Sequence, residues 1–336
     1  RRRKMECADL HGERSTGMEP RRLRLAAIQM VSINGRVAEN LTRAEHWAKL
    51  AAEHRAEVVL LPELFSTGFE INAHAWKAAE PQDGPTERWL VATARRHDYF
   101  IGGSYLEHRG DDFFDTFALA GPTGIAGRVR KRHPCSVEAY IFKGGDDPQV
   151  IETPLGRFGV AICYDASLRE VWDRLLTSSP DLLLVPMSAP TPAKTLFYGQ
   201  RKIEAFHASF YDCATQSARL LGIPCAMSNK WGQWNTALPG LIPKLALGHQ
   251  RSSFPGFTHI ADSNGREVAR VAAGEDVSVA TVRLDSSLKR RSLPPERERF
   301  RPWIAEVPSE YRFFAVFEAL GRRWYARGRV RGQEKA

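Results

Sequence analysis

The sequence predicts an α/β fold in which one large domain carries most of the chain. Short apolar, β-branched runs alternate with longer stretches of helical periodicity, which is typical of strands connected by helices. A length of 336 residues allows one or two domains, but no Gly/Ser-rich linker, repeat or low-complexity tract divides the chain. The predicted strands are residues 25–30, 58–61, 100–103, 158–163, 182–185 and 224–227, and the predicted helices include residues 40–54, 87–97 and 206–221.

One predicted strand ends on a cysteine, in Gly156-Arg-Phe-Gly-Val-Ala-Ile-Cys163-Tyr-Asp165. A thiol on a tight turn between a buried strand and a helix is well placed to act as a nucleophile. The backbone N–H of Tyr164 can then face a developing oxyanion. A cysteine beside Val and Ile is also a common inert core residue, so this stretch alone does not decide between the two roles.

Two further segments end on a chargeable residue. The apolar run over residues 58–61 predicts a strand buried on both faces. Pro62 would end this strand and Glu63 follows at once, so the carboxylate of Glu63 is expected at the strand's end. Lys131 lies in the basic segment Gly127-Arg-Val-Arg-Lys131-Arg-His-Pro134. Singly, each has an ordinary alternative: a solvated loop glutamate and a basic turn.

Taken in order, Glu63, Lys131 and Cys163 resemble the pattern of the nitrilase superfamily, the carbon–nitrogen hydrolases. The spacings of 68 and 32 residues fit that pattern. Glu138 lies where the family keeps a second glutamate. The resemblance extends to a first strand at residues 23–30, a first helix at residues 40–54 and a late strand pair at residues 254–265. It implies a four-layer α-β-β-α sandwich that associates into a homodimer or a larger homo-oligomer.

The resemblance also implies a role for each residue. Cys163 attacks an amide or nitrile carbon and forms a covalent thioester or thioimidate. Glu63 is the general base that takes the thiol proton and later returns it to the leaving group. Lys131 stabilises the oxyanion with the Tyr164 N–H, and its charge favours the thiolate. Glu138 orients Lys131, the substrate or water, and no cofactor or metal is implied.

The residues after the cysteine indicate the substrate class. Tyr164-Asp165 resembles the amidase branches, whereas true nitrilases tend to carry Trp or Gly followed by Glu. We therefore predict a hydrolase that converts a small non-peptide amide to a carboxylic acid and ammonia. Nitrilase and N-carbamoyl amidohydrolase activity are the alternatives. Leu168 and Arg169 replace the family's aromatic residue and proline, which leaves the start of the next helix undefined.

Residues 230–252 depart from the family's short hairpin. Their Gly, Pro and Trp content predicts an ordered loop. Aromatic residues here and elsewhere either line the substrate pocket, which would favour an apolar acyl group, or pack within the fold. The pocket candidates are Tyr140, Phe197, Tyr198, Trp231 and Trp234.

Two other classes of protein remain as alternatives. In a papain-like enzyme His133 would be the base for Cys163, but such enzymes place the histidine far downstream of the cysteine. In a non-enzymatic scaffold the nitrilase-like fold would bind a ligand without turnover, and the presence of all three triad residues argues against that.

The net charge of +9 lies in the two ends. Residues 1–24 carry +4 and residues 286–336 carry +7, whereas the middle carries −2. We predict a basic, flexible arm over residues 1–22, a catalytic domain over 23–285 and a basic extension over 286–336. The extension is predicted to contain an amphipathic helix, whose apolar stripe is Phe313, Phe317, Leu320 and Trp324. We expect this helix to dock on this chain or on a second subunit. The alternative is that it lies on a membrane surface. Recognised nucleic-acid-binding motifs are absent, which excludes nucleic acid as the expected partner.

The cysteine content and the hydropathy predict a cytoplasmic protein. The five cysteines are odd in number and show no disulfide framework or zinc spacing. A catalytic thiol also functions best in a reducing compartment. No segment has the length of a transmembrane helix, and the start lacks the apolar stretch of a signal peptide.

Overall fold

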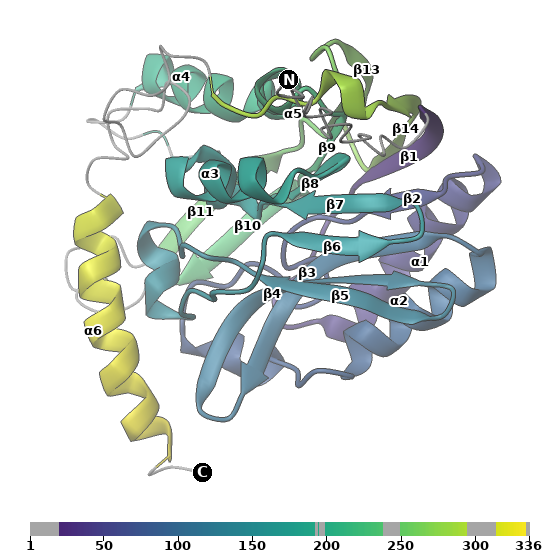
Figure 1. Ribbon diagram of the computed structural model, residues 1–336. Coiled ribbons are helices and arrows are strands. Elements are labelled where there is room, and N and C mark those ends of the chain that lie inside the picture. Colours follow the sequence, from purple (N-terminus) through teal and green to yellow (C-terminus); the bar gives the residue numbers. More distant parts are fainter. Residues whose placement is uncertain (1–19, 192–193, 195–198, 238–248, 294–313, 334–336) are drawn as a thin grey trace, which may run out of the picture.

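Two six-stranded sheets form the centre of the molecule (Figure 1). The computed structural model describes residues 20–191, 194, 199–237, 249–293 and 314–333. In sheet order, the first sheet contains β14 (Asp276–Leu284), β1 (Arg21–Gln29), β2 (Val58–Leu60), β3 (Phe100–Arg109), β4 (Asp112–Gly121) and β5 (Gly124–Arg130). The second contains β13 (Glu267–Arg270), β12 (His259–Ala261), β9 (Cys225–Ser228), β8 (Leu182–Pro186), β7 (Gly156–Val160) and β6 (Val150–Thr153).

Each sheet has three parallel strands at its centre and antiparallel strands at its edges. The parallel strands are β1, β2 and β3 in the first sheet, and β7, β8 and β9 in the second. Parallel neighbours bring their carboxyl ends to one edge of a sheet, which is where α/β proteins place their sites.

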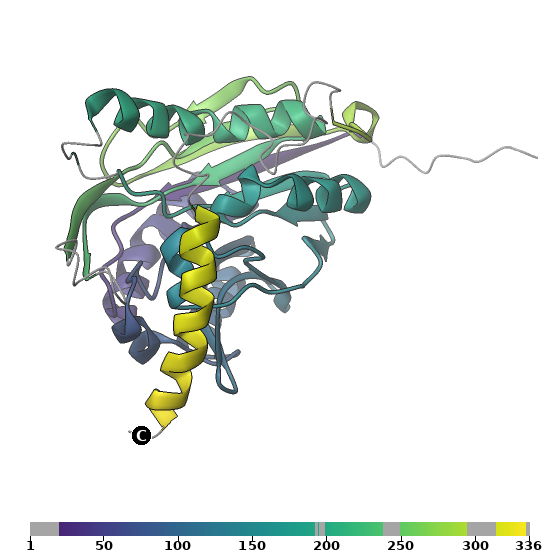
Figure 2. The same ribbon diagram turned by 90° about the vertical axis from the view of Figure 1, so that its left-hand side faces the viewer.

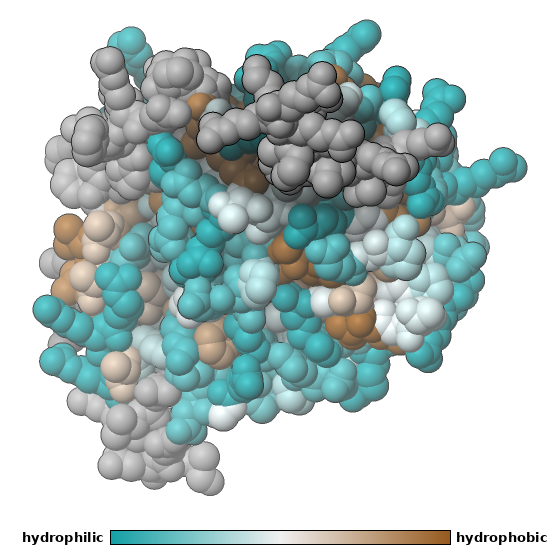
Figure 3. Space-filling view, in the orientation of Figure 1, coloured by the Kyte–Doolittle hydropathy of each residue, from teal (hydrophilic) through white to brown (hydrophobic). Residues whose placement is uncertain are grey.

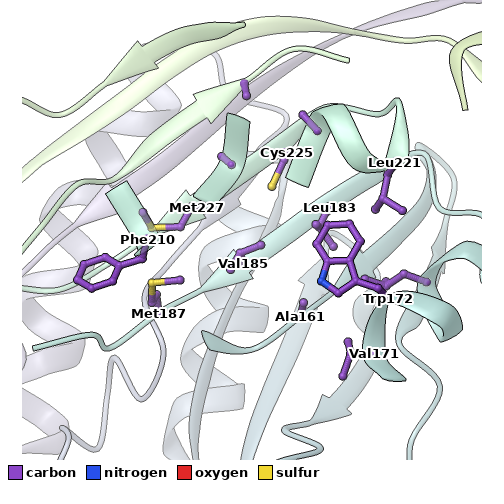
Figure 4. Packing of buried hydrophobic residues seen from close by; sticks show 14 of the residues in the cluster. Ala161, Val171, Trp172, Leu183, Val185, Met187, Phe210, Leu221, Cys225 and Met227 are labelled. Atoms are coloured by element: carbon purple, nitrogen blue, oxygen red, sulfur yellow. The ribbon is translucent and has the colours of Figure 1, made fainter. Parts of the chain in front are cut away.

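The sheets pack face to face, and helices cover their outer faces. Between the sheets, Leu60 and Phe117 of the first meet Phe158 and Leu184 of the second, all of them fully buried. The outer helices are α1 (Val37–Glu53) and α2 (Pro85–His97) on the first sheet, and α3 (Arg169–Ser178), α4 (Gln200–Tyr211) and α5 (Cys213–Leu221) on the second. Figure 4 shows Trp172 of α3 packed beside Leu183 of β8. The predicted four-layer α-β-β-α sandwich is therefore confirmed.

Several local predictions change in detail. β1 begins at Arg21, two residues before the predicted domain start, and the arm's residues 1–19 lie outside the described residues. The single helix predicted over 206–221 is two helices, α4 and α5. α3 begins at Arg169 without the family's proline. The short 3-10 helices are η1 (Ala73–Ala78), η2 (Ser136–Tyr140), η3 (Cys163–Ser167) and η5 (Ser286–Leu288).

The prediction of a loop over residues 230–252 is wrong for its two flanks. β10 (Trp231–Ala237) pairs antiparallel with β11 (His249–Pro255) in a separate two-stranded sheet. The side chains of β10 alternate, since Trp234 and Thr236 are buried while Gln233 and Asn235 are exposed. This period of two is the strand signal that the Gly and Pro content obscures.

A long C-terminal helix, α6 (Phe314–Gln333), packs beside the sandwich against η2 (Figures 1 and 2). A Cβ atom on Gly321 would lie 2.8 Å from the backbone carbon of Ala139, so the glycine permits this close approach. The predicted apolar stripe matches the face of α6 that contacts the sandwich only in part. Leu320 is 45% exposed, because Gly321 and the buried Tyr325 make the contact instead, and Phe313 lies outside the described residues.

The described surface is mainly hydrophilic on the face that Figure 3 shows, where hydrophobic residues appear in small groups. Within the described ranges, no helix is long and apolar enough to cross a membrane.

Candidate active site

Residues that are far apart in the sequence meet at one edge of the sandwich. Glu63 follows β2, Lys131 directly follows β5, and Cys163 opens η3 after β7. Lys131 Nζ donates a hydrogen bond to Glu63 Oε1 at 2.7 Å and forms an ion pair with Glu138 Oε2 at 2.6 Å. Glu63 and Lys131 are fully buried, and the charges of Glu63, Lys131 and Glu138 all act on the Cys163 thiol. The structure thus brings together the three residues that the sequence pattern singles out.

The backbone is strained beside these side chains. Cys163, Leu64 and Ser136 have φ values of 51°, 47° and 52°, a left-handed region that non-glycine residues seldom adopt. Such conformations cost roughly 1–3 kcal/mol each and persist where the surroundings enforce them, often at functional sites. The strain at Cys163 turns the chain sharply from β7 into η3, so that the thiol lies at the end of the strand.

Three hydrogen bonds fix the turn that carries Glu63. Ser188 Oγ donates to the Glu63 carbonyl oxygen at 2.8 Å. The Leu64 N–H donates to Ser104 Oγ at 2.7 Å, and Lys230 Nζ donates to the Leu64 carbonyl oxygen at 3.0 Å. All of these groups are buried, so the carboxylate of Glu63 has little freedom to move.

The buried charges at the site stabilise one another. Burial alone would raise the pKa of Glu63, but the charge of Lys131 and hydrogen bonding lower it below its usual value. Burial alone would likewise lower the pKa of Lys131, but the charges of Glu138 and Glu63 raise it well above its usual value. At neutral pH these directions favour a cationic Lys131 and an ionised Glu63.

The Cys163 thiol is protonated at rest. Burial and the charge of Glu63 raise the pKa of Cys163 well above its usual value, and Lys131 lowers it by less. Lys131 thus favours the thiolate, as expected, but burial and the charge of Glu63 outweigh its effect on the pKa of Cys163. Nucleophilic attack then requires a base that removes the proton as the bond forms.

Glu138 is the second carboxylate of the cluster. Its Oε2 accepts a 2.6 Å hydrogen bond from the Cys135 backbone N–H, which closes the first turn of η2. Burial raises the pKa of Glu138 to about 7, with the charge of Glu63 acting in the same direction and that of Lys131 opposing it. Glu138 therefore contributes a negative charge at and above neutral pH that acts on both Lys131 and Cys163.

Removing the negative charge of Glu138 is expected to make the Cys163 thiol more reactive. Glu138→Gln keeps an acceptor for the Cys135 N–H but removes a charge that raises the pKa of Cys163, so the pKa of the thiol falls. At pH 8 we expect iodoacetamide to alkylate Cys163 roughly threefold faster or more, as measured by mass spectrometry. Glu170→Gln, which removes a carboxylate paired with Arg132, is the control. Equal rates in Glu138→Gln and wild type would contradict this account of the site's charges.

Asp165 connects the segment after Cys163 to the segment after Lys131. Its carboxylate accepts hydrogen bonds from the backbone N–H groups of Arg132 (2.8 Å) and His133 (2.9 Å). Burial raises the pKa of Asp165 to about 7. His133 Nε2 lies 3.2 Å from Glu170 Oε2, so this ring pairs with a carboxylate of α3.

Two further buried titratable residues lie at the site, and the sequence pattern does not single them out. Burial lowers the pKa of Lys230 to about 7, and burial together with the charge of Glu63 raises the pKa of Asp115 well above its usual value. Lys230 lies two residues after the end of β9, a position like that of Glu63 after β2. Asp115 lies within β4, where no local sequence signal marks it.

A cavity of about 230 Å³ lies beside Cys163. Of the five predicted pocket residues, Trp234 lines the cavity. Tyr140 and Trp231 are not among the lining residues that the structure describes. Phe197 and Tyr198 lie outside the described residues. Tyr140 packs instead on Trp324 of α6, with 5.7 Å between ring centroids. The described lining is mainly apolar: Phe69, Ile71, Val137, Tyr164, Ala166, Met187, Ala189, Pro190, Phe206, Phe210, Trp234 and Phe314, beside Cys135, Ser136, Glu138, Cys163, Ser167, Ser209 and Cys213.

Comparison with known proteins agrees with this fold. A carbon-nitrogen hydrolase family model matches residues 24–289. A nitrilase from Pyrococcus abyssi is 29% identical over 175 residues, covering 50% of this chain and 67% of the relative. An omega-amidase NIT2 from Xenopus tropicalis is 30% identical over 175 residues, covering 49% and 63%. The structure of a carbon-nitrogen hydrolase from Helicobacter pylori G27 superposes with a TM-score of 0.67 at 18% identity, covering 79% of this chain and 90% of that one.

The fold is that of a carbon–nitrogen hydrolase. The chain belongs to the carbon-nitrogen hydrolase family of the nitrilase superfamily. Its matches span about two thirds of the length of these curated relatives.

Proposed function

We propose that this protein hydrolyses small amides to carboxylic acids and ammonia through a thioester on Cys163. The observation that carries the proposal is the buried Glu63–Lys131–Glu138 cluster, with distances of 2.7 and 2.6 Å, beside a cavity that Cys163 lines. The omega-amidase among the similar proteins supports an amide substrate, and the nitrilase of comparable identity supports the nitrile alternative. Tyr164-Asp165 after the cysteine favours the amide.

In the first half-reaction, Glu63 removes the thiol proton as the sulfur bonds to the amide carbon. Lys131 and the backbone N–H of Tyr164 stabilise the negative charge that forms on the oxygen. The carbon–nitrogen bond then breaks, and Glu63 gives its proton to the departing ammonia. In the second half-reaction, Glu63 activates a water molecule that attacks the thioester. The acid leaves, and the proton returns to the sulfur.

The lining of the cavity favours an apolar acyl group. Phe69, Met187, Phe210 and Trp234 present aromatic and aliphatic surface to the space beside Cys163. Burial of such a group contributes about 25 cal/mol for each Å² removed from water, whereas a charged acyl group would lose its hydration here.

The experiment is a panel of amides, nitriles and carbamoyl compounds incubated with the purified full chain. We expect ammonia release that is fastest for amides with apolar acyl groups, and an acyl adduct on Cys163 visible by mass spectrometry after acid quenching. Turnover only of nitriles or carbamoyl compounds would replace the amide assignment. No turnover and no adduct on any member of the panel would favour a non-enzymatic scaffold.

Other predictions from the sequence stay as proposals. These are the homodimer or larger homo-oligomer, the cytoplasmic location and the division into a basic arm, a catalytic domain and a basic extension.

A further inference from the structure

The C-terminal helix α6 supplies part of the cavity wall. Phe314, its first residue, lines the cavity beside Cys163. The Phe314 ring meets the ring of Tyr164 edge-on, with 5.7 Å between centroids. A residue outside the stretch matched by the family model therefore borders the space beside the candidate nucleophile.

Contacts along α6 fix the helix in this place. Gly321 lets the helix approach the backbone of Ala139. Further along, the Tyr325 hydroxyl accepts a hydrogen bond from the Phe113 N–H at 2.9 Å, and Tyr325 is buried. These anchors lie two and three turns away from Phe314, so they hold the helix without touching the cavity.

A contact between these anchors and Phe314 connects α6 to Glu138. The Glu318 carboxylate accepts a hydrogen bond from the Ser136 backbone N–H. Ser136 has the strained φ of 52° and begins η2, the 3-10 helix that carries Glu138. The same helix face that presents Phe314 to the cavity therefore also supports the turn beneath Glu138.

We propose that Phe314 is a specificity-determining residue that limits the size of the acyl group the site accepts. That the ligand is an amide rests on the proposed function, whereas the position of Phe314 in the cavity wall does not depend on that function. Phe314 lines a cavity of about 230 Å³, and replacing its phenyl ring with a hydrogen by mutation to alanine opens room for a larger apolar chain. Val316 on the same helix is 56% exposed and is not among the cavity's described lining residues.

The test compares Phe314→Ala and Phe314→Leu with the matched control Val316→Ala. The first measurement is kcat/KM for amides of increasing acyl bulk, from acetamide to phenylacetamide and longer arylalkanamides. The second is the rate at which 2-chloroamides of increasing bulk alkylate Cys163, which does not depend on turnover. Thermal unfolding of each variant checks that the fold is retained, and Phe314→Leu provides the test if Phe314→Ala does not fold.

We expect Phe314→Ala to raise the ratio of bulky to small substrate by about tenfold or more in both measurements. Phe314→Leu should show a smaller change in the same direction, and Val316→Ala should match wild type. Unchanged ratios in both Phe314 variants would overturn the inference. If wild type releases no ammonia but the alkylation ratio shifts, the proposed function fails while the role of Phe314 stands.

Discussion

Replacing Cys163 with alanine is expected to abolish amide hydrolysis, with a loss of about 10⁴-fold or more in kcat. Without the sulfur no thioester can form, and the remaining groups can only assist direct attack by water. The fold should persist, because Cys163 is only partly buried and alanine removes one atom from the edge of the cavity. Ammonia release from the best amide of the panel measures the loss.

Cys135 provides the matched comparison, since its thiol lines the same cavity and is also free. Cys135→Ala keeps the backbone N–H that donates a hydrogen bond to Glu138, so turnover should remain measurable. An acyl adduct that forms on the Cys163→Ala variant but disappears in Cys135→Ala would assign the nucleophile to Cys135 instead and would sink the proposed mechanism.

The sequence identifies the residues of the cluster because of the way an α/β sandwich is built. Glu63 and Cys163 each follow an apolar run closely, and parallel strands deliver such residues to a common edge of their sheet. The same reasoning applied to β9 would have found Lys230, whose sequence position resembles that of Glu63. A strand-end rule thus finds Glu63, Cys163 and Lys230, but it does not find Asp115, which lies within β4. The rule also says nothing about which of these groups share a proton or a hydrogen bond.

The strand-end rule cannot predict which residues line the cavity, and the reason is physical. Its wall combines Phe210 of α4, Trp234 of β10 and Phe314 of α6. In each case the sequence spacing fits a core position equally well, and only the packing of the elements decides which ring faces the cavity. The face of α6 illustrates the point, since the approach allowed by Gly321 leaves Leu320 exposed although the apolar periodicity predicts it to be in contact.

Replacing Glu63 with glutamine is expected to reduce kcat by about 10³-fold or more, because the thiol then has no base. Burial is the largest influence on the pKa of Cys163 and raises it by more than Lys131 lowers it, so the fraction of thiolate in the variant is still small at neutral pH. Gln is nearly isosteric with Glu, and its carbonyl oxygen can still accept the hydrogen bond from Lys131. The loss therefore reports the missing proton transfer rather than a collapsed site.

The reactivity of Cys163 separates this role from a merely structural one. Since the charge of Glu63 raises the pKa of the thiol, Glu63→Gln lowers that pKa and favours the thiolate above neutral pH. We expect iodoacetamide to alkylate Cys163 of this variant at pH 9 at least as fast as in wild type, while amide turnover is lost. Alkylation and turnover lost together would mean that Glu63 only shapes the site. Turnover kept near the wild-type rate would show that another group takes the proton, and Glu138, with its pKa of about 7, would be the next residue to replace.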